Sequence, residues 1–196
     1  MGYCRNMSFN PRRLRTPNEL RALSHPLRLD ILEQLMLHGP MTASDLGAAL
    51  DEVPANCSWH LRKLAEHGFV EEAGDGRGRR RPWRVTQVGL TWNDEDGESD
   101  HPGYRAASKA MTEVFVEREV ARWRRNSAAA QPNWAGLGMS ETVAFLTEEE
   151  ARAFSDDLEE LLLRHHGRLT GDDPIPAGAR RVHVLALTSV DPEDVR

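Results

Sequence analysis

The chain has 196 residues, of which 39% are hydrophobic and 29% charged, and a net charge of -6 at neutral pH. This length suits one large domain or two small ones, at ~100–200 residues per domain. No apolar run approaches the ~20 residues of a membrane helix and the N-terminus carries no secretory signal, so we expect a cytoplasmic protein without membrane contacts. The two cysteines, Cys4 and Cys57, exclude a disulfide framework and an all-cysteine zinc site.

The charge is distributed unevenly along the chain. Residues 1–90 carry 13 Lys and Arg against 10 Asp and Glu, a balance of +3, whereas residues 91–196 carry 12 against 21, a balance of -9. Five arginines lie within eight positions: Arg77, Arg79, Arg80, Arg81 and Arg84. This asymmetry indicates a basic working half and an acidic accessory half.

Capping signatures predict the first helices. Residues 1–15 are expected to form a flexible basic arm, which ends where Thr16 and Glu19 make a capping box. Ser24 is expected to cap a second helix over residues 25–38, because the leucines and isoleucine of that segment recur at helical spacing. Two helices therefore follow each other closely after the arm.

Two further helices are joined by a tight connection. Thr42 and Asp45 open a short helix over residues 43–50, and Pro54 opens a helix over residues 54–67. Three residues of the second helix face inward at helical spacing: Cys57, Leu61 and Leu64. Strands are predicted over 69–73 and 81–86, and they form a hairpin whose tip is rich in glycine and arginine.

The second half is predicted to be mainly helical. Residues 91–101 are an acidic linker, a long helix covers 102–126, and a strand over 141–146, a helix over 148–166 and a strand over 181–189 follow. The fold class is therefore α+β, a winged helix-turn-helix followed by a mainly helical dimerisation region with a small strand–helix–strand unit. The expected divisions are an arm over 1–15, a DNA-binding domain over 16–90, a linker over 91–101, and a dimerisation and possible ligand-sensing region over 102–196.

Two short helices followed by a basic hairpin have the order of a winged helix-turn-helix, in which the second helix enters a major groove. Residues 19–86, about a third of the chain, resemble the DNA-binding domain of ArsR-type winged-helix regulators, and the extended C-terminal part is similar to actinobacterial members. The segments that carry the resemblance are LRALSHPLRLDILEQL (20–35), TASDLGAAL (42–50), SWHLRKLAEHGFVEE (58–72) and RGRRRPWRVT (77–86).

The resemblance implies a homodimeric transcription factor, usually a repressor, that binds an imperfect palindrome of double-stranded DNA. It places base contacts on Pro54, Ala55, Asn56, Ser58 and Trp59. Backbone contacts fall on the residues Thr42, Arg62, Lys63, Arg77, Arg79, Arg80 and Arg81. The expected dimerisation residues are Leu20, Tyr104, Met111 and Phe115.

Two positions depart from the family pattern. Asp51 stands where the turn usually has glycine, and we expect the turn to survive because Asp tolerates a left-handed conformation. The position of Trp59 is often arginine or tyrosine. The family's Cys-x-Cys metal motif has no counterpart in residues 43–50, so we expect neither a metal nor a cofactor.

Alternative functions remain open. The winged helix could be a protein–protein interaction adaptor without specific DNA binding, or a metal-responsive repressor that uses His101 or His165. A small-molecule effector of unknown identity could bind between helix 102–126, the 141–189 unit and the hairpin. No enzyme motif is found, and Cys57 is interpreted as a buried, inert thiol.

Overall fold

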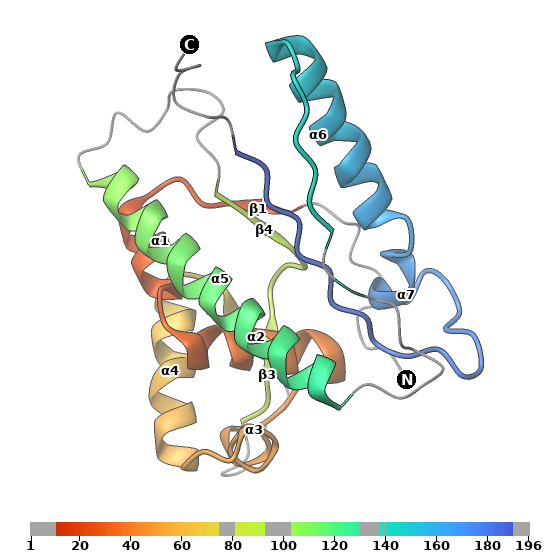
Figure 1. Ribbon diagram of the computed structural model, residues 1–196. Coiled ribbons are helices and arrows are strands. Elements are labelled where there is room, and N and C mark those ends of the chain that lie inside the picture. The colour runs from red at the N-terminus through yellow and green to blue at the C-terminus, as the bar shows by residue number, and fades with distance from the viewer. Residues whose placement is uncertain (1–10, 75–80, 93–102, 130–137, 139, 190–196) are drawn as a thin grey trace.

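The computed structural model describes residues 11–74, 81–92, 103–129, 138 and 140–189 (Figure 1). Four short helices form its N-terminal part, and a hairpin and a long helix follow them. The helices are α1 (Pro17–Leu23), α2 (Pro26–His38), α3 (Ala43–Leu50) and α4 (Pro54–Glu66).

The predicted capping boxes open α1 and α3. The hydroxyl of Thr16 accepts from the Glu19 amide, and Thr42 accepts from the Asp45 amide in the same way. The cap of α2 differs from the expectation, because His25 accepts from the Leu27 amide through Nδ1, at 3.2 Å. Ser24 instead ends α1, where its hydroxyl donates to the Leu20 carbonyl at 2.8 Å.

The core lies where the four N-terminal helices meet. Each of these helices contributes fully buried leucine or isoleucine side chains to the centre of the core. The hairpin adds Val70 and Val85. The core members from the four helices include Leu20, Leu23, Ile31, Leu35, Leu46, Leu61 and Leu64. Burial of this kind stabilises by about 1.5–3 kcal/mol per large aliphatic side chain.

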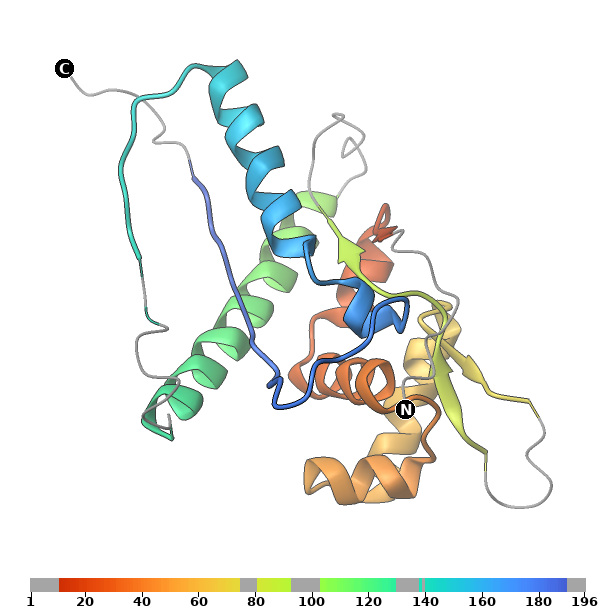
Figure 2. The same ribbon diagram turned by 90° about the vertical axis from the view of Figure 1, so that its right-hand side faces the viewer.

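The predicted hairpin is present. Strand β2 (Val70–Glu72) pairs antiparallel with β3 (Trp83–Val85), and the register places Val70 opposite Val85. An isolated bridge between Met41 and Trp83 joins the hairpin to the segment before α3. The hairpin is thereby held against the helix-turn-helix (Figure 2).

The end of the predicted arm is ordered. Strand β1 (Arg12–Arg13) pairs in parallel with β4 (Leu90–Thr91), and Leu14 is buried. Arg12 donates to the Gly68 and His67 carbonyls and pairs with Glu19 at 2.6 Å. Residues 11–15 differ from the expected flexible arm because these long-range bonds hold them; residues 1–10 lie outside the described part.

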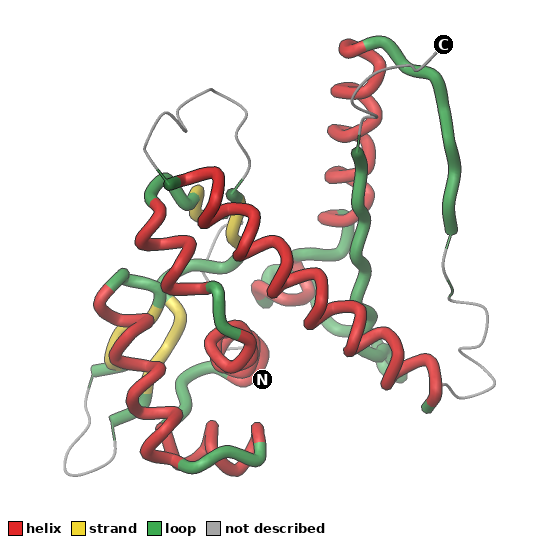
Figure 3. Tube along the Cα trace, turned by 60° about the vertical axis from the view of Figure 1, so that its left-hand side comes forward, coloured by secondary structure: helices red, strands yellow, loops and turns green. Residues whose placement is uncertain are grey.

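Helix α5 (Tyr104–Ala128) packs on α1 (Figure 3). Tyr104 and Met111 are buried in this contact, together with Leu20, and the Tyr104 hydroxyl donates to the Leu14 carbonyl at 2.9 Å. Phe115 packs edge-on against Trp92, with 5.4 Å between the ring centroids. All four expected dimerisation residues thus make contacts inside one subunit, where Leu20, Tyr104 and Met111 are buried and Phe115 is half-buried; their part in a dimer stays a prediction.

A group of ion pairs joins α5 to α2. Arg118 donates to Asp30 at 2.7 Å and also bonds Glu33 and Glu119, and Arg122 bonds Glu33 as well. Burial alone would raise the pKa of Glu33, but the two arginines outweigh it and lower that pKa. The charges are therefore mutually compensated at the packing surface of the two helices.

The C-terminal region differs from its prediction in one respect. Helices α6 (Glu148–Leu163) and α7 (Gly167–Thr170) form, and Thr147 opens α6 with the predicted capping box. The expected strands over 141–146 and 181–189 are not formed: both segments run extended beside α6 without a ladder in the described residues (Figures 2 and 3). A strand needs a hydrogen-bonded neighbour, and neither segment has one among the residues that the structure describes.

None of the helices in the described ranges is both long and apolar enough to cross a bilayer.

Candidate nucleic-acid interface

The turn between α3 and α4 is built from a left-handed residue and a small one. Asp51 has φ 54° and ψ 46°, as expected for the residue that replaces the usual glycine. The Glu52 amide donates to the Gly47 carbonyl at 2.9 Å. A side chain at Gly47 would bring its Cβ within 2.7 Å of the Glu52 carbonyl oxygen, so the close approach of the two helices needs glycine there.

Helix α4 has one buried and one exposed face. The buried residues Cys57, His60, Leu61 and Leu64 anchor it in the core. Among the five expected base contacts, four are exposed and Ser58 is half-buried. The exposed four are Pro54, Ala55, Asn56 and Trp59. The first turns of α4 therefore present a continuous outward surface of small, amide and aromatic groups.

A carboxylate missed by the sequence analysis orients Asn56. The Asn56 side-chain amide donates from Nδ2 to Glu52 Oε2 at 3.0 Å. This leaves one Nδ2 hydrogen and the Oδ1 acceptor of Asn56 available, which is the pair of groups that an adenine edge requires. Glu52 lies one turn before Asn56, so the (i, i+4) spacing was the available signal.

Trp59 projects from α4 with 51% of its surface exposed. Its ring meets the His60 ring edge-on at 4.8 Å, and the Lys63 ammonium lies 5.9 Å from the indole centroid. Lys63 also pairs with Glu66 at 2.9 Å. The aromatic face of Trp59 is thus flanked by a cation and remains accessible to a ligand.

The remaining candidates for backbone contacts already have local partners. The Thr42 hydroxyl is bound in its capping box with Asp45, and the Arg62 guanidinium donates to Ser58 Oγ at 3.1 Å. These bonds are solvent-exposed and carry little stability, so they can be exchanged for bonds to a phosphate.

The wing is the hairpin of β2 and β3, and ion pairs compensate the arginines that flank or belong to its strands. Arg81 pairs with Glu72 at 3.2 Å and Arg84 pairs with Glu71 at 2.7 Å across the two strands. Three of the expected wing contacts, Arg77, Arg79 and Arg80, lie outside the described residues. The strands of the wing are therefore close to electrically neutral.

Residues 23–73 match a family model described as a helix-turn-helix domain. This segment contains α3 and α4, and with the hairpin of β2 and β3 the N-terminal part of the chain has the architecture of a winged helix-turn-helix, as the sequence predicted.

Several solved structures of regulators are similar to this winged helix-turn-helix protein. The transcriptional regulator Tm0710 from Thermotoga maritima is 16% identical, with 74% of this chain and 79% of that chain covered and a TM-score of 0.30. The Mycobacterium tuberculosis MarR family protein Rv2887, in complex with salicylic acid, is 22% identical, with 74% of this chain and 85% of that chain covered and a TM-score of 0.30. A variant of Staphylococcus aureus MepR bound to an oligodeoxyribonucleotide is 20% identical, with 73% of this chain and 77% of that chain covered and a TM-score of 0.25. A search of curated proteins gives no match.

Two histidines pack against each other on the buried side of α4 in this winged helix-turn-helix. The His25 and His60 rings lie 4.5 Å apart, and His60 Nδ1 is buried without a hydrogen-bond partner. Burial lowers the pKa of His60, and His25 and Arg28 add to this effect, while Glu52 opposes it. Burial and Arg28 lower the pKa of His25 in the same way, so both rings stay neutral near pH 7.

Cys57 is fully buried on α4. Burial raises the pKa of its thiol, and the nearby Glu52 carboxylate raises it further. A protonated, inaccessible thiol is a poor nucleophile, so the interpretation as an inert core residue is favoured.

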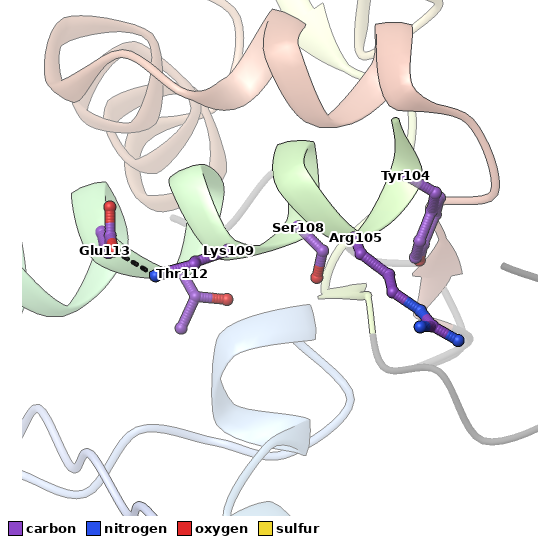
Figure 4. A pocket seen from close by; sticks show the side chains of 6 residues that line it. All are labelled: Tyr104, Arg105, Ser108, Lys109, Thr112 and Glu113. Carbon is purple, nitrogen blue, oxygen red and sulfur yellow. Dashed lines mark ion pairs between the residues drawn. The ribbon is translucent and has the colours of Figure 1, made fainter. Parts of the chain in front are cut away.

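One open pocket lies along α5, facing the C-terminal region (Figure 4). Its volume is about 440 Å³, and most of its lining surface is apolar although polar residues supply it. The lining residues are Tyr104, Arg105, Ser108, Lys109, Thr112 and Glu113. The expected tryptophan cluster is not its lining: Trp92 packs on Phe115, Trp123 is exposed and Trp134 lies outside the described residues.

Among the residues that are described, no three His, Cys, Asp or Glu side chains are grouped closely enough to hold an ion. His101, one of the two histidines considered for a metal-responsive repressor, lies outside those residues.

Proposed function

We propose that this protein is a DNA-binding transcriptional regulator, a homodimeric repressor that reads an imperfect palindrome with α4 and the arginine-rich wing. The observation that carries the proposal is the exposed first half of α4, which follows α3 through the tight turn at Asp51. A helix presented in this way can insert into a major groove, while the preceding helix crosses the backbone.

Each group at this surface has a chemical task in the proposal. Asn56 pairs with an adenine through its amide, held in orientation by Glu52. Trp59 packs on a thymine methyl or a sugar, and Ser58, Pro54 and Ala55 complete the contact with base edges. The residues proposed for phosphates are Thr42, Arg62, Lys63, Arg77, Arg79, Arg80 and Arg81.

A dimer is part of the proposal because one α4 covers only a half-site. Two recognition helices related by a two-fold axis would reach two successive major grooves about one helical turn apart. The acidic C-terminal half would face away from the DNA and orient the protein by repulsion.

The test is a titration of the purified protein against DNA from its own upstream region, with a scrambled duplex beside it. Fluorescence anisotropy at two salt concentrations measures both affinities. We expect tight binding that prefers the upstream DNA and weakens steeply with salt, since phosphate contacts release counterions. Equal, weak binding to both duplexes contradicts autoregulation, and absence of binding at low salt favours the adaptor function.

An effector would act on this repressor only by binding the DNA-incompetent state more tightly. We propose the pocket along α5 as its site, because α5 packs on α1 and reaches α2 through Arg118. Once a screen has identified an inducer, Ser108→Trp should abolish the response by filling the pocket. Retention of the full response by that variant would exclude this site.

A further inference from the structure

The two extended segments of the C-terminal region expose apolar side chains to an unusual degree. Val143 is 84% and Phe145 91% exposed in segment 140–146, and Val184 is 68% and Leu187 66% exposed in segment 181–189. Of the fourteen large apolar side chains exposed in the described residues, eleven lie within 140–189. Such a concentration on one part of a chain marks an interaction surface.

The sequence of these segments has the pattern of strands. Val143 and Phe145 are two residues apart and share a face, as do Val182 and Val184, whereas Leu185 and Leu187 point to the opposite face. A segment that is apolar on both faces is typical of a central strand with neighbours on both edges. In the described part of one chain neither segment has a ladder, so the edges are open.

Helix α6 has a matching unused face. Its apolar residues lie on one stripe, yet none of its residues is buried. The stripe consists of Ala151, Phe154, Leu158, Leu161 and Leu162. A pair of strands covered by an amphipathic helix forms a two-layer unit with a buried core. The described part of one chain contains the two segments and the helix, but the segments are not paired and the helix stripe is not buried.

Charge favours a second copy of this chain as the occupant. Helix α6 carries seven carboxylates and one arginine. Arg180 and Arg181, at the start of segment 181–189, are exposed and have no ion pair among the described residues. Two-fold pairing brings the basic segment of each copy toward the acidic helix of the other. The unit also lies away from α3 and α4, so its contacts leave the DNA surface open (Figure 3).

The size of the surface also fits a dimer. A stable interface buries about 800 Å² on each partner and has an apolar core. Ten large apolar side chains on two segments and one helix face can supply such a core, whereas the expected dimerisation residues Leu20, Tyr104 and Met111 are already buried in the subunit.

We propose that residues 181–189 of two copies pair as antiparallel strands about the two-fold axis, with residues 141–146 as outer strands and the two α6 helices packed on one face of the sheet. Identical strands related by a two-fold axis must run antiparallel. Main-chain hydrogen bonds supply the pairing, and the alternating valines and leucines supply the specificity. The proposal rests on the homodimer of the proposed function and names its interface.

The test uses the full chain and three single variants. Val184→Glu and Leu187→Glu each place a charge in the proposed sheet, while Ala153→Glu adds the same charge on the polar side of α6. Sedimentation velocity over a range of concentrations should give a dimer for the unaltered chain and for Ala153→Glu. Dimer dissociation constants at least tenfold higher are expected for the other two. A monomeric unaltered chain, or unchanged dimers of Val184→Glu and Leu187→Glu, would overturn the proposal.

Hydrogen exchange separates this interface from other dimers. Backbone amides of 181–189 should be protected in the dimer and exchange rapidly in Val184→Glu, while amides of α2 and α4 stay protected in both. A dimer in which 181–189 exchange rapidly would refute the proposed sheet. DNA titration of the same samples distinguishes the two proposals, because a dimer with the expected protection but no DNA binding refutes only the repressor function.

Discussion

The N-terminal residues 11–92 and the C-terminal residues 140–189 use the same local signals with opposite results. Each has a threonine capping box opening an amphipathic helix: Thr42 for α3 and Thr147 for α6. In the first region the apolar stripes are buried, whereas in the second no large apolar side chain is fully covered. Local sequence therefore decides where a helix begins, but only a neighbouring surface decides whether its stripe becomes a core.

Core truncation should give the largest difference between the two regions. Leu61→Ala removes a fully buried side chain of α4 and should lower the free energy of unfolding by about 2–5 kcal/mol. Phe154→Ala, on the exposed stripe of α6, should change the unfolding of the N-terminal domain by less than about 0.5 kcal/mol. Urea titrations followed by hydrogen exchange of α2 amides measure both. Equal losses would show that the two regions share one core.

Loss of the ion pairs between α5 and α2 should have the next largest effect on the free energy of unfolding. Arg118→Met removes the guanidinium from Asp30 and leaves Glu33 to Arg122 alone, and loss of a partly buried charged hydrogen bond costs about 1–3 kcal/mol. The matched exposed pair is Arg152 with Glu148 on α6, and Arg152→Met should cost less than about 1 kcal/mol. The same urea titration compares them. A small loss for Arg118→Met would mean that water reaches the pair.

Variants of the proposed DNA contacts test whether the basic N-terminal region, and not the acidic C-terminal region, binds DNA. The double variant Arg79→Ala, Arg80→Ala should weaken binding to all DNA sequences and reduce the slope of the log binding constant against log salt concentration by about 2. Arg152→Ala on α6 should change neither the affinity nor this slope. Asn56→Ala should cost about 1–3 kcal/mol at a single base position. Competition titrations with singly substituted operators measure these effects. An unchanged base preference of Asn56→Ala would remove Asn56 from the base contacts.

Acid should destabilise the N-terminal region through its paired histidines. The pKa values of His25 and His60 are lowered in the folded protein by burial, so the unfolded chain binds more protons as the pH falls below their ordinary value of about 6.5. Stability is therefore full above pH 6.5 and decreases on acidification. The melting temperature should fall between pH 7 and pH 5, and less so in His60→Gln. An identical pH dependence in His60→Gln would contradict this role.

The smallest effect is expected at the turn before α4. Asp51→Gly removes the strain of a non-glycine residue at φ 54° and should stabilise the fold by up to about 1 kcal/mol, while Asp51→Val should destabilise it. Thermal unfolding measures both changes. A loss of stability in Asp51→Gly would indicate that the carboxylate itself contributes to the fold.

Most of the winged helix could be predicted because its signals are local. The capping boxes at Thr16 and Thr42, the helical spacing of Leu61 and Leu64, and the hairpin over 69–86 all follow from neighbours within a few residues. Long-range contacts could not be predicted in this way. An example is the pairing of Arg12 with Leu90. The cap of α2 is a local contact, but the neighbouring residues Ser24 and His25 can both accept from a helix amide, and the structure uses His25.

The sequence by itself determined the order of the main helices, most of their starts and the winged helix-turn-helix type of the N-terminal part, since capping, periodicity and turn chemistry act between close neighbours. The tertiary structure alone decided which apolar residues are covered. It buried Leu20, Tyr104 and Met111 inside the subunit, and it left Val143 and Phe145 exposed. Burial depends on which surfaces meet in space, and a strand acquires its ladder only from a neighbour that the local sequence does not contain.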